Sequence, residues 1–151
     1  MINYANRIKY LREKVGKSEE EICTVLNITS MSLYDLETYK DELLSVLSLN
    51  QVLKLANLFN IPSLQLFTEI ESDSQINHLE YNELIKSIHQ YCEIEKKSIE
   101  ILENEVGWSL DALFESQEKF LNSYDVSFLV EIGNSLNINW LTLIPNNIHV
   151  T

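Results

Sequence analysis

The side chains that commonly carry out covalent or metal chemistry are few in this sequence and lie far apart. Two cysteines, Cys23 and Cys92, and three histidines, His78, His89 and His149, form none of the short spacings typical of metal sites or catalytic thiols. The sequence also contains no glycine-rich phosphate loop and no nucleophile elbow. We interpret both cysteines as small core or boundary residues. We therefore expect no enzymatic activity, no cofactor and no bound metal.

Short polar signals place the helices that must carry any other function. With only three Gly and two Pro in 151 residues, the chain favours helices joined by short turns, an all-α fold. Gly16 is suited to end a first helix, and Ser18 with Glu21 predicts a capping box for a second. Thr29 is suited to cap a third helix. Pro62 is suited to the first position of a short fifth one.

The chain repeats itself with an offset of 77 residues. This register pairs Tyr4 with Tyr81 and gives 14 identities over residues 4–67 without a gap. The other identical pairs begin at Ile8, Lys9, Ile22, Asn27, Ser32, Leu33, Leu36, Leu44, Asn57, Asn60, Ile61, Leu64 and Leu66. Because this period exceeds the 20–50 residues of solenoid repeats, it predicts two tandem five-helix domains. We call residues 1–67 the first copy and 81–151 the second copy, and interpret 68–80 as an acidic linker.

The negative charge is concentrated outside the first copy. The net charge of −12 divides into −1 for residues 1–67, −4 for 68–80 and −7 for 81–151. Because binding to DNA depends on neutralising phosphates, only the first copy is a candidate for it. No apolar run is long enough to span a membrane and no signal peptide precedes the first helix, so we expect a cytoplasmic protein with no membrane partner.

Several motifs of the first copy occur in the order of a known family. They are Ile8-x-x-Leu11-Arg12, Gly16-x-Ser18, Ile22 to Thr29, Leu33-x-x-Leu36-Glu37, Leu55-Ala56 and Ile61-Pro62-x-Leu64-x-x-Phe67. The set resembles the lambda-repressor/Cro helix-turn-helix family, also called the xenobiotic-response-element type. The resemblance covers residues 7–67 and, through the repeat, more weakly 84–144. It implies a DNA-binding regulator of transcription.

The resemblance also implies a structural ion pair between the first helix and the end of the third. Arg12 and Glu37 occupy those positions, with a phosphate contact by Arg12 as the alternative. The second copy has His89 and Phe114 instead, which predicts that packing replaces the salt bridge there. We expect Arg12→Ala to destabilise the first copy without changing any DNA specificity.

Both copies depart from the family in a longer connection before the fourth helix, residues 38–54 and 115–131. This connection is rich in apolar residues: Leu43, Leu44, Val46, Leu47, Phe120, Leu121 and Tyr124. Two interpretations stay open. It either adds core to each copy or forms a docking surface between copies or subunits.

By the resemblance, the residues of the first copy that face DNA carry little positive charge. The candidates are Lys17, Ser18, Ser30, Met31, Ser32, Tyr34, Asp35, Thr38 and Lys40. Serine hydroxyls can hydrogen-bond to bases or phosphates, and Met31 can contact a thymine methyl group. Glu19 and Asp35 would repel phosphates. The corresponding positions of the second copy are Gly107, Trp108, Ser109, Asp111, Ala112 and Glu115.

Two functions from different classes follow. In the first, the first copy binds double-stranded DNA and the acidic second copy dimerises or contacts a protein. In the alternative, the chain is a protein-interaction module that has lost DNA binding, such as an antirepressor, an antitoxin-like partner or a DNA mimic. Trp108 is a candidate partner-binding residue, with packing in the core or between domains as its alternative. The two copies can also pair within one chain, which would bring residues 64–67 and 141–144 together.

Overall fold

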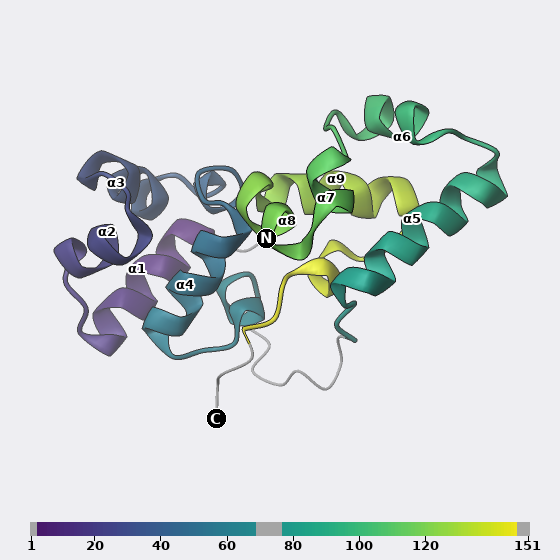
Figure 1. Ribbon diagram of the computed structural model, residues 1–151. Coiled ribbons are helices and arrows are strands. Elements are labelled where there is room, and N and C mark those ends of the chain that lie inside the picture. The colour runs from purple at the N-terminus through teal and green to yellow at the C-terminus, as the bar shows by residue number, and fades with distance from the viewer. Residues whose placement is uncertain (1–2, 69–76, 148–151) are drawn as a thin grey trace.

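The computed structural model describes residues 3–68 and 77–147, which form an all-α structure (Figure 1). No helix in these two stretches is long and apolar enough to cross a membrane. The charged stretch at 69–76, most of the expected linker, lies outside the described residues. The two ends of the linker are ordered: Thr68 is buried, and the backbone N–H of Leu79 donates to the carbonyl of Thr142 at 2.8 Å.

The first copy contains four α-helices and two short 3-10 helices. Its elements are α1 (Tyr4–Val15), α2 (Glu19–Leu26), α3 (Ser30–Thr38), η1 (Glu42–Leu44), α4 (Leu49–Phe59) and η2 (Ser63–Leu66). The predicted caps are present: Gly16 ends α1 in the left-handed conformation, and Ser18 and Glu21 form the capping box of α2. The expected fifth helix is a 3-10 turn, and Pro62 precedes its first residue instead of occupying it.

The second copy has one more α-helix than the first. Its elements are α5 (Tyr81–Glu95), α6 (Ile99–Val106), α7 (Asp111–Glu115), α8 (Gln117–Ser123), α9 (Val126–Leu136) and η4 (Trp140–Leu143). Helix α8 occupies the place that η1 has in the first copy. The described part of this half therefore has five α-helices, in a layout that inserts α8 before the last long helix.

The gap-free register of the repeat is wrong in one segment. Helix α5 is three residues longer than α1, and Ser98 caps α6 as Ser18 caps α2, which makes the offset there 80 residues. The Ile22/Ile99 and Asn27/Asn104 identities are therefore coincidences, because Ile22 corresponds in the structure to buried Leu102. The offset of 77 returns at Leu110, which is buried as Leu33 is.

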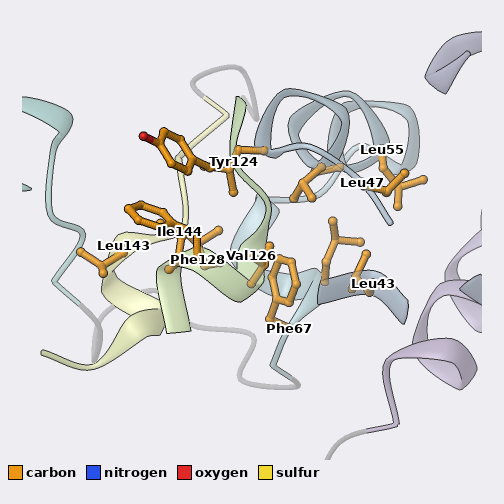
Figure 2. Close-up of a cluster of buried hydrophobic side chains, with 14 of the residues drawn as sticks. Leu43, Leu47, Leu55, Phe67, Tyr124, Val126, Phe128, Leu143 and Ile144 are labelled. Atoms are coloured by element: carbon orange, nitrogen blue, oxygen red, sulfur yellow. The ribbon is translucent and has the colours of Figure 1, made fainter. Parts of the chain in front are cut away.

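One hydrophobic core runs through both copies. Leu43 and Leu47, from the long connection of the first copy, are fully buried in the same cluster as Tyr124 and Phe128 of the second (Figure 2). Both interpretations of the long connection apply, because η1 packs against α1 and α3 of its own copy and also against α9 of the other. The rings of Phe67 and Trp140 meet edge to face at 5.9 Å, so the two C-terminal turns also lie together, as pairing within one chain predicts.

Polar contacts complete the seam between the copies. The Leu49 N–H donates to the Tyr124 carbonyl at 2.9 Å. At the other end of the seam, the amide side chain of Asn147 accepts from the Ser63 N–H at 2.7 Å and donates to the Ile61 carbonyl at 2.8 Å. Since Asn147 is itself buried, these bonds satisfy polar groups that would otherwise be costly to bury.

Candidate nucleic-acid interface

Helices α2 and α3 are joined by a tight turn in which Asn27 ends one helix and Thr29 caps the next. Asn27 ends α2 with a φ of 54°, a conformation that asparagine tolerates better than most residues. Thr29 then caps α3 by accepting from the Ser32 N–H at 3.1 Å. Leu33 and Leu36 are buried and fix α3 against the core. This arrangement holds the opposite side of α3 toward solvent, at the end of the molecule farthest from α5 and α6 (Figure 1).

Most of the predicted contact residues lie on that exposed side. Met31 is 67% exposed and Tyr34 is 59% exposed, and Ser30 and Thr38 are exposed as well. Ser32 differs because its hydroxyl bonds to that of Thr29 at 3.1 Å and is half-buried. The exposed side of α3 therefore offers hydroxyl groups, a thioether and a phenol.

The guanidinium of Arg12, near this face, is engaged in an ion pair within the first copy. The Nε and Nη2 atoms of Arg12 donate hydrogen bonds to the two carboxylate oxygens of Glu37 at 2.6 and 3.0 Å. These hydrogen bonds to Glu37 raise the pKa of Arg12. The predicted structural ion pair is thus present, and it favours that role over a phosphate contact. Glu19 lies 3.8 Å from the same guanidinium.

The remaining cations near the face are mostly screened by neighbouring groups. Lys17 pairs with Glu21 at 3.7 Å, and Lys14 lies over the ring of Tyr10 at 5.8 Å. Lys40 is exposed just after α3 but is followed by Asp41 and Glu42.

The first turn of α2 adds negative charge beside α3. It carries Glu19, Glu20 and Glu21, which stabilise the helix N-terminus but repel a phosphate. A hydrogen bond from the Ser18 backbone N–H lowers the pKa of Glu21, which keeps this carboxylate ionised. A ligand of this face must therefore tolerate a carboxylate border.

The second copy lacks the corresponding surface. Five residues separate the cap residue Asn27 from Leu33 in the first copy, but only two separate Gly107 from Leu110 in the second. The missing residues are those that begin α3, and α7 is only five residues long. Gly107, Trp108 and Ser109, predicted at recognition positions, are therefore wrong as helix residues: Gly107 ends α6 and the other two lie in the turn.

Trp108 is packed within its own copy. Its ring meets Tyr124 at 5.8 Å and Phe128 at 5.7 Å, and it is half-buried. These contacts favour the packing interpretation over a partner-binding role. The equivalent of the Arg12 site also holds packed rings, because His89 stacks on Phe114 at 5.2 Å and 20°. The prediction that packing replaces the salt bridge is confirmed.

Tyr124 is the structurally important residue that the sequence did not reveal. Its hydroxyl donates to the Ser109 carbonyl at 2.6 Å and accepts from the Leu113 N–H at 3.2 Å. It thereby holds the shortened α7 in place, with its ring buried at the seam. Burial raises the pKa of this phenol. Only the hydrogen bonds reveal this role, since the sequence shows only an aromatic residue in an apolar segment.

The thiols and carboxylates form no further site in the described part of the chain. Cys23 and Cys92 are half-buried and reduced, and burial raises the pKa of each thiol, which disfavours the reactive thiolate. Within residues 3–68 and 77–147 no three His, Cys, Asp or Glu side chains gather as metal ligands would. His149 lies outside the described residues.

Comparisons with known proteins add no relative to these observations. No protein-family model matches the chain, and neither the curated proteins nor the solved structures yield a match. The motifs of the first copy and the geometry of α2 and α3 are therefore the features that bear on function.

Proposed function

We propose that the chain is a DNA-binding regulator in which α3 of the first copy contacts the major groove. The observation that carries this proposal is the capped α2–turn–α3 unit, with Ser30, Met31 and Tyr34 projecting from α3 into solvent. A helix presented in this way is how helix-turn-helix proteins reach base edges. The Arg12–Glu37 pair, which the family resemblance implies, supports the same assignment.

The charges around α3 favour weak, sequence-dependent binding over strong nonspecific binding. Few cations are free to neutralise phosphates, so the electrostatic part of the affinity is small. Each good base contact contributes only about 1–3 kcal/mol of discrimination. We therefore expect a recognisable DNA sequence preference with modest affinity.

Selection of the purified chain on fragmented genomic DNA tests this function. The selection is run at about 50 and about 200 mM salt, because DNA binding weakens steeply over that range. Enrichment of a shared sequence at low salt, reduced at high salt, is the expected result. Failure to enrich any sequence even at low salt would contradict DNA binding.

A second candidate, binding of a basic protein partner, is favoured by the carboxylates beside α3. Glu19 is 67% exposed in its side chain, and Met31 and Tyr34 supply exposed apolar area on α3. On this alternative the acidic border attracts the partner instead of repelling phosphates.

Glu19→Gln separates the two candidates because they predict opposite signs. Removing the negative charge should strengthen binding to DNA and weaken binding to a basic protein. Glu100→Gln, in the first turn of α6, is the matched control, since it makes the same charge change away from α3. Equal effects of the two variants would show that only net charge matters and would contradict a binding role for the face of α3.

A further inference from the structure

The two copies meet around a pseudo-two-fold axis. The repeat makes Ser48 equivalent to Asp125, and these two residues pair with each other in an isolated antiparallel bridge. A residue that contacts its own equivalent lies on the axis of an isologous, two-fold interface. The seam thus has the geometry of a symmetric dimer formed within one chain.

Residues that lie near one another away from the axis are related by the same symmetry. The Ser127 hydroxyl donates to the Leu44 carbonyl at 3.0 Å. The symmetry-related residues are Asn50 and Leu121, and both line one surface cavity. A two-fold interface requires such reciprocal neighbours, in which each copy presents the same surface to the other.

The residues on the axis are buried and therefore inaccessible to any other chain. Leu47, Leu49 and Val126 have no exposed surface, and Tyr124 is 3% exposed. A second molecule can reach this face only if the two copies separate. The seam therefore occupies the surface that a second chain would need in order to pair across this axis.

We infer that the second copy is a built-in second subunit from which the DNA-contacting helix turn has been removed. One chain then acts as a monomer and contacts one half-site of non-palindromic duplex DNA. The half-site part of this inference rests on the proposed function, whereas the built-in subunit does not.

The predicted DNA ligand follows from the geometry. A symmetric helix-turn-helix dimer reads two half-sites whose centres lie about 10 bp apart, and its site is a near-palindrome. Here α3 has no counterpart, because α7 is short and the Leu110 N–H before it is held by the Glu103 carboxylate at 2.6 Å. The recognised sequence is therefore asymmetric and covers less than about one helical turn.

A pair of cysteines placed on the axis tests, without DNA, whether the second copy acts as a built-in subunit. Antiparallel paired residues lie about 4.5–5.5 Å apart between Cα atoms, within the range that a disulfide spans. Ser48→Cys with Asp125→Cys, in a Cys23→Ala/Cys92→Ala background, should oxidise to an intramolecular disulfide and keep the 17.6 kDa mass of the monomer. Covalent dimers as the main product, or no cross-link in the folded variant, would overturn the inference.

The single variant Ser48→Cys in the same background keeps the test decisive if the double variant fails to fold. In a homodimer paired through this face, two copies of residue 48 would lie together on the true axis and cross-link the chains. A built-in subunit prevents this, so the single variant should remain monomeric under oxidation. Native mass spectrometry of the unaltered chain should likewise give the monomer, and a stable dimer through this face would overturn the inference.

The symmetry of the selected DNA sequence tests whether one chain contacts a single half-site. One asymmetric motif, bound by one chain per duplex, is the expected result. An inverted repeat bound by two chains would overturn the half-site while leaving DNA binding intact. No motif, together with an intramolecular disulfide, would instead refute the proposed function and with it the half-site, and would support the built-in subunit alone.

Discussion

Replacing Arg12 with alanine should destabilise the protein because it leaves a carboxylate buried without its partner. The side chains of Arg12 and Glu37 are only 13% and 11% exposed, and two hydrogen bonds of 2.6 and 3.0 Å join them. In Arg12→Ala, the Glu37 carboxylate loses both hydrogen bonds while little water reaches it. The fold must then bear most of the cost of desolvating that charge.

The size of the effect follows from this partial burial. Removing one partner of a fully buried pair costs about 3–5 kcal/mol, and a hydrogen bond to a charged group is worth about 1.5–3 kcal/mol. Because both side chains retain some contact with water, we expect a loss of about 2–3 kcal/mol in the free energy of unfolding. For a chain of this size that corresponds to a fall of about 5–10 °C in Tm.

Thermal unfolding followed by circular dichroism measures this loss. Lys97→Ala is the control, because Lys97 and Glu105 are also 2.6 Å apart but their side chains are 31% and 32% exposed, so water screens the pair. We expect a much smaller change in Tm for the control. The double variant Arg12→His/Glu37→Phe copies the stack found in the second copy and should recover most of the loss. An unchanged Tm in Arg12→Ala, with an altered DNA sequence preference, would refute the structural role of this pair.

Three further predictions follow from the seam and the helices beside it. Gly133→Ala should lower the free energy of unfolding by about 1–3 kcal/mol, because a Cβ there would lie 2.8 Å from the carbonyl oxygen of Ile138. Ala56→Gly, at the equivalent position of the first copy, should lower it by only about 0.5–1 kcal/mol. Equal losses for the two variants in urea unfolding would contradict this. Burial raises the pKa of Asp125, so folding favours its neutral form and its charge lowers stability as pH rises above the unfolded pKa. Asp125→Asn should therefore raise Tm at pH 7, and the gain should shrink as pH falls from neutral toward about 4, the usual pKa of an unfolded aspartate; a gain that grows in acid would have the wrong sign. The shared core predicts one unfolding transition in calorimetry, and two separate transitions would refute it.

Local signals in the sequence predicted the first copy well. The Ser-x-x-Glu pattern at Ser18 identified the capping box, since capping depends only on residues within one turn. The Arg12–Glu37 pair followed from the family resemblance and is present. Helical spacing also separated buried Leu33 and Leu36 from the exposed side of α3.

The second copy was predicted less well because identities alone set its register. Ile99 and Asn104 matched residues of the first copy by coincidence, and the match concealed the extra turn of α5. The N-cap pattern carried the correct signal, because Ser98 corresponds to Ser18 and implies an offset of 80. Cap residues mark helix ends, whereas an identical residue inside a helix does not.

Tertiary contacts account for what the sequence left open. The apolar connection at 38–54 allowed either added core or docking, and only the structure shows Leu47 buried at the seam. The role of the Tyr124 hydroxyl depends on Leu113 and Ser109, which reach it only after α7 and α8 have packed. No local pattern in the amino-acid sequence predicts such tertiary contacts.

The most direct test of DNA binding by the first copy compares the exposed sides of α3 and α7 in one titration. Fluorescence anisotropy with a duplex carrying the selected sequence measures the affinity of the unaltered chain and of two variants. The variant Ser30→Ala/Met31→Ala/Tyr34→Ala alters α3, and Asp111→Ala/Glu115→Ala alters α7. We expect the affinity to fall about tenfold or more for the α3 variant and to show no loss for the α7 variant. An unchanged affinity of the α3 variant, or an equal loss in both, would contradict the claim that the first copy alone contacts DNA.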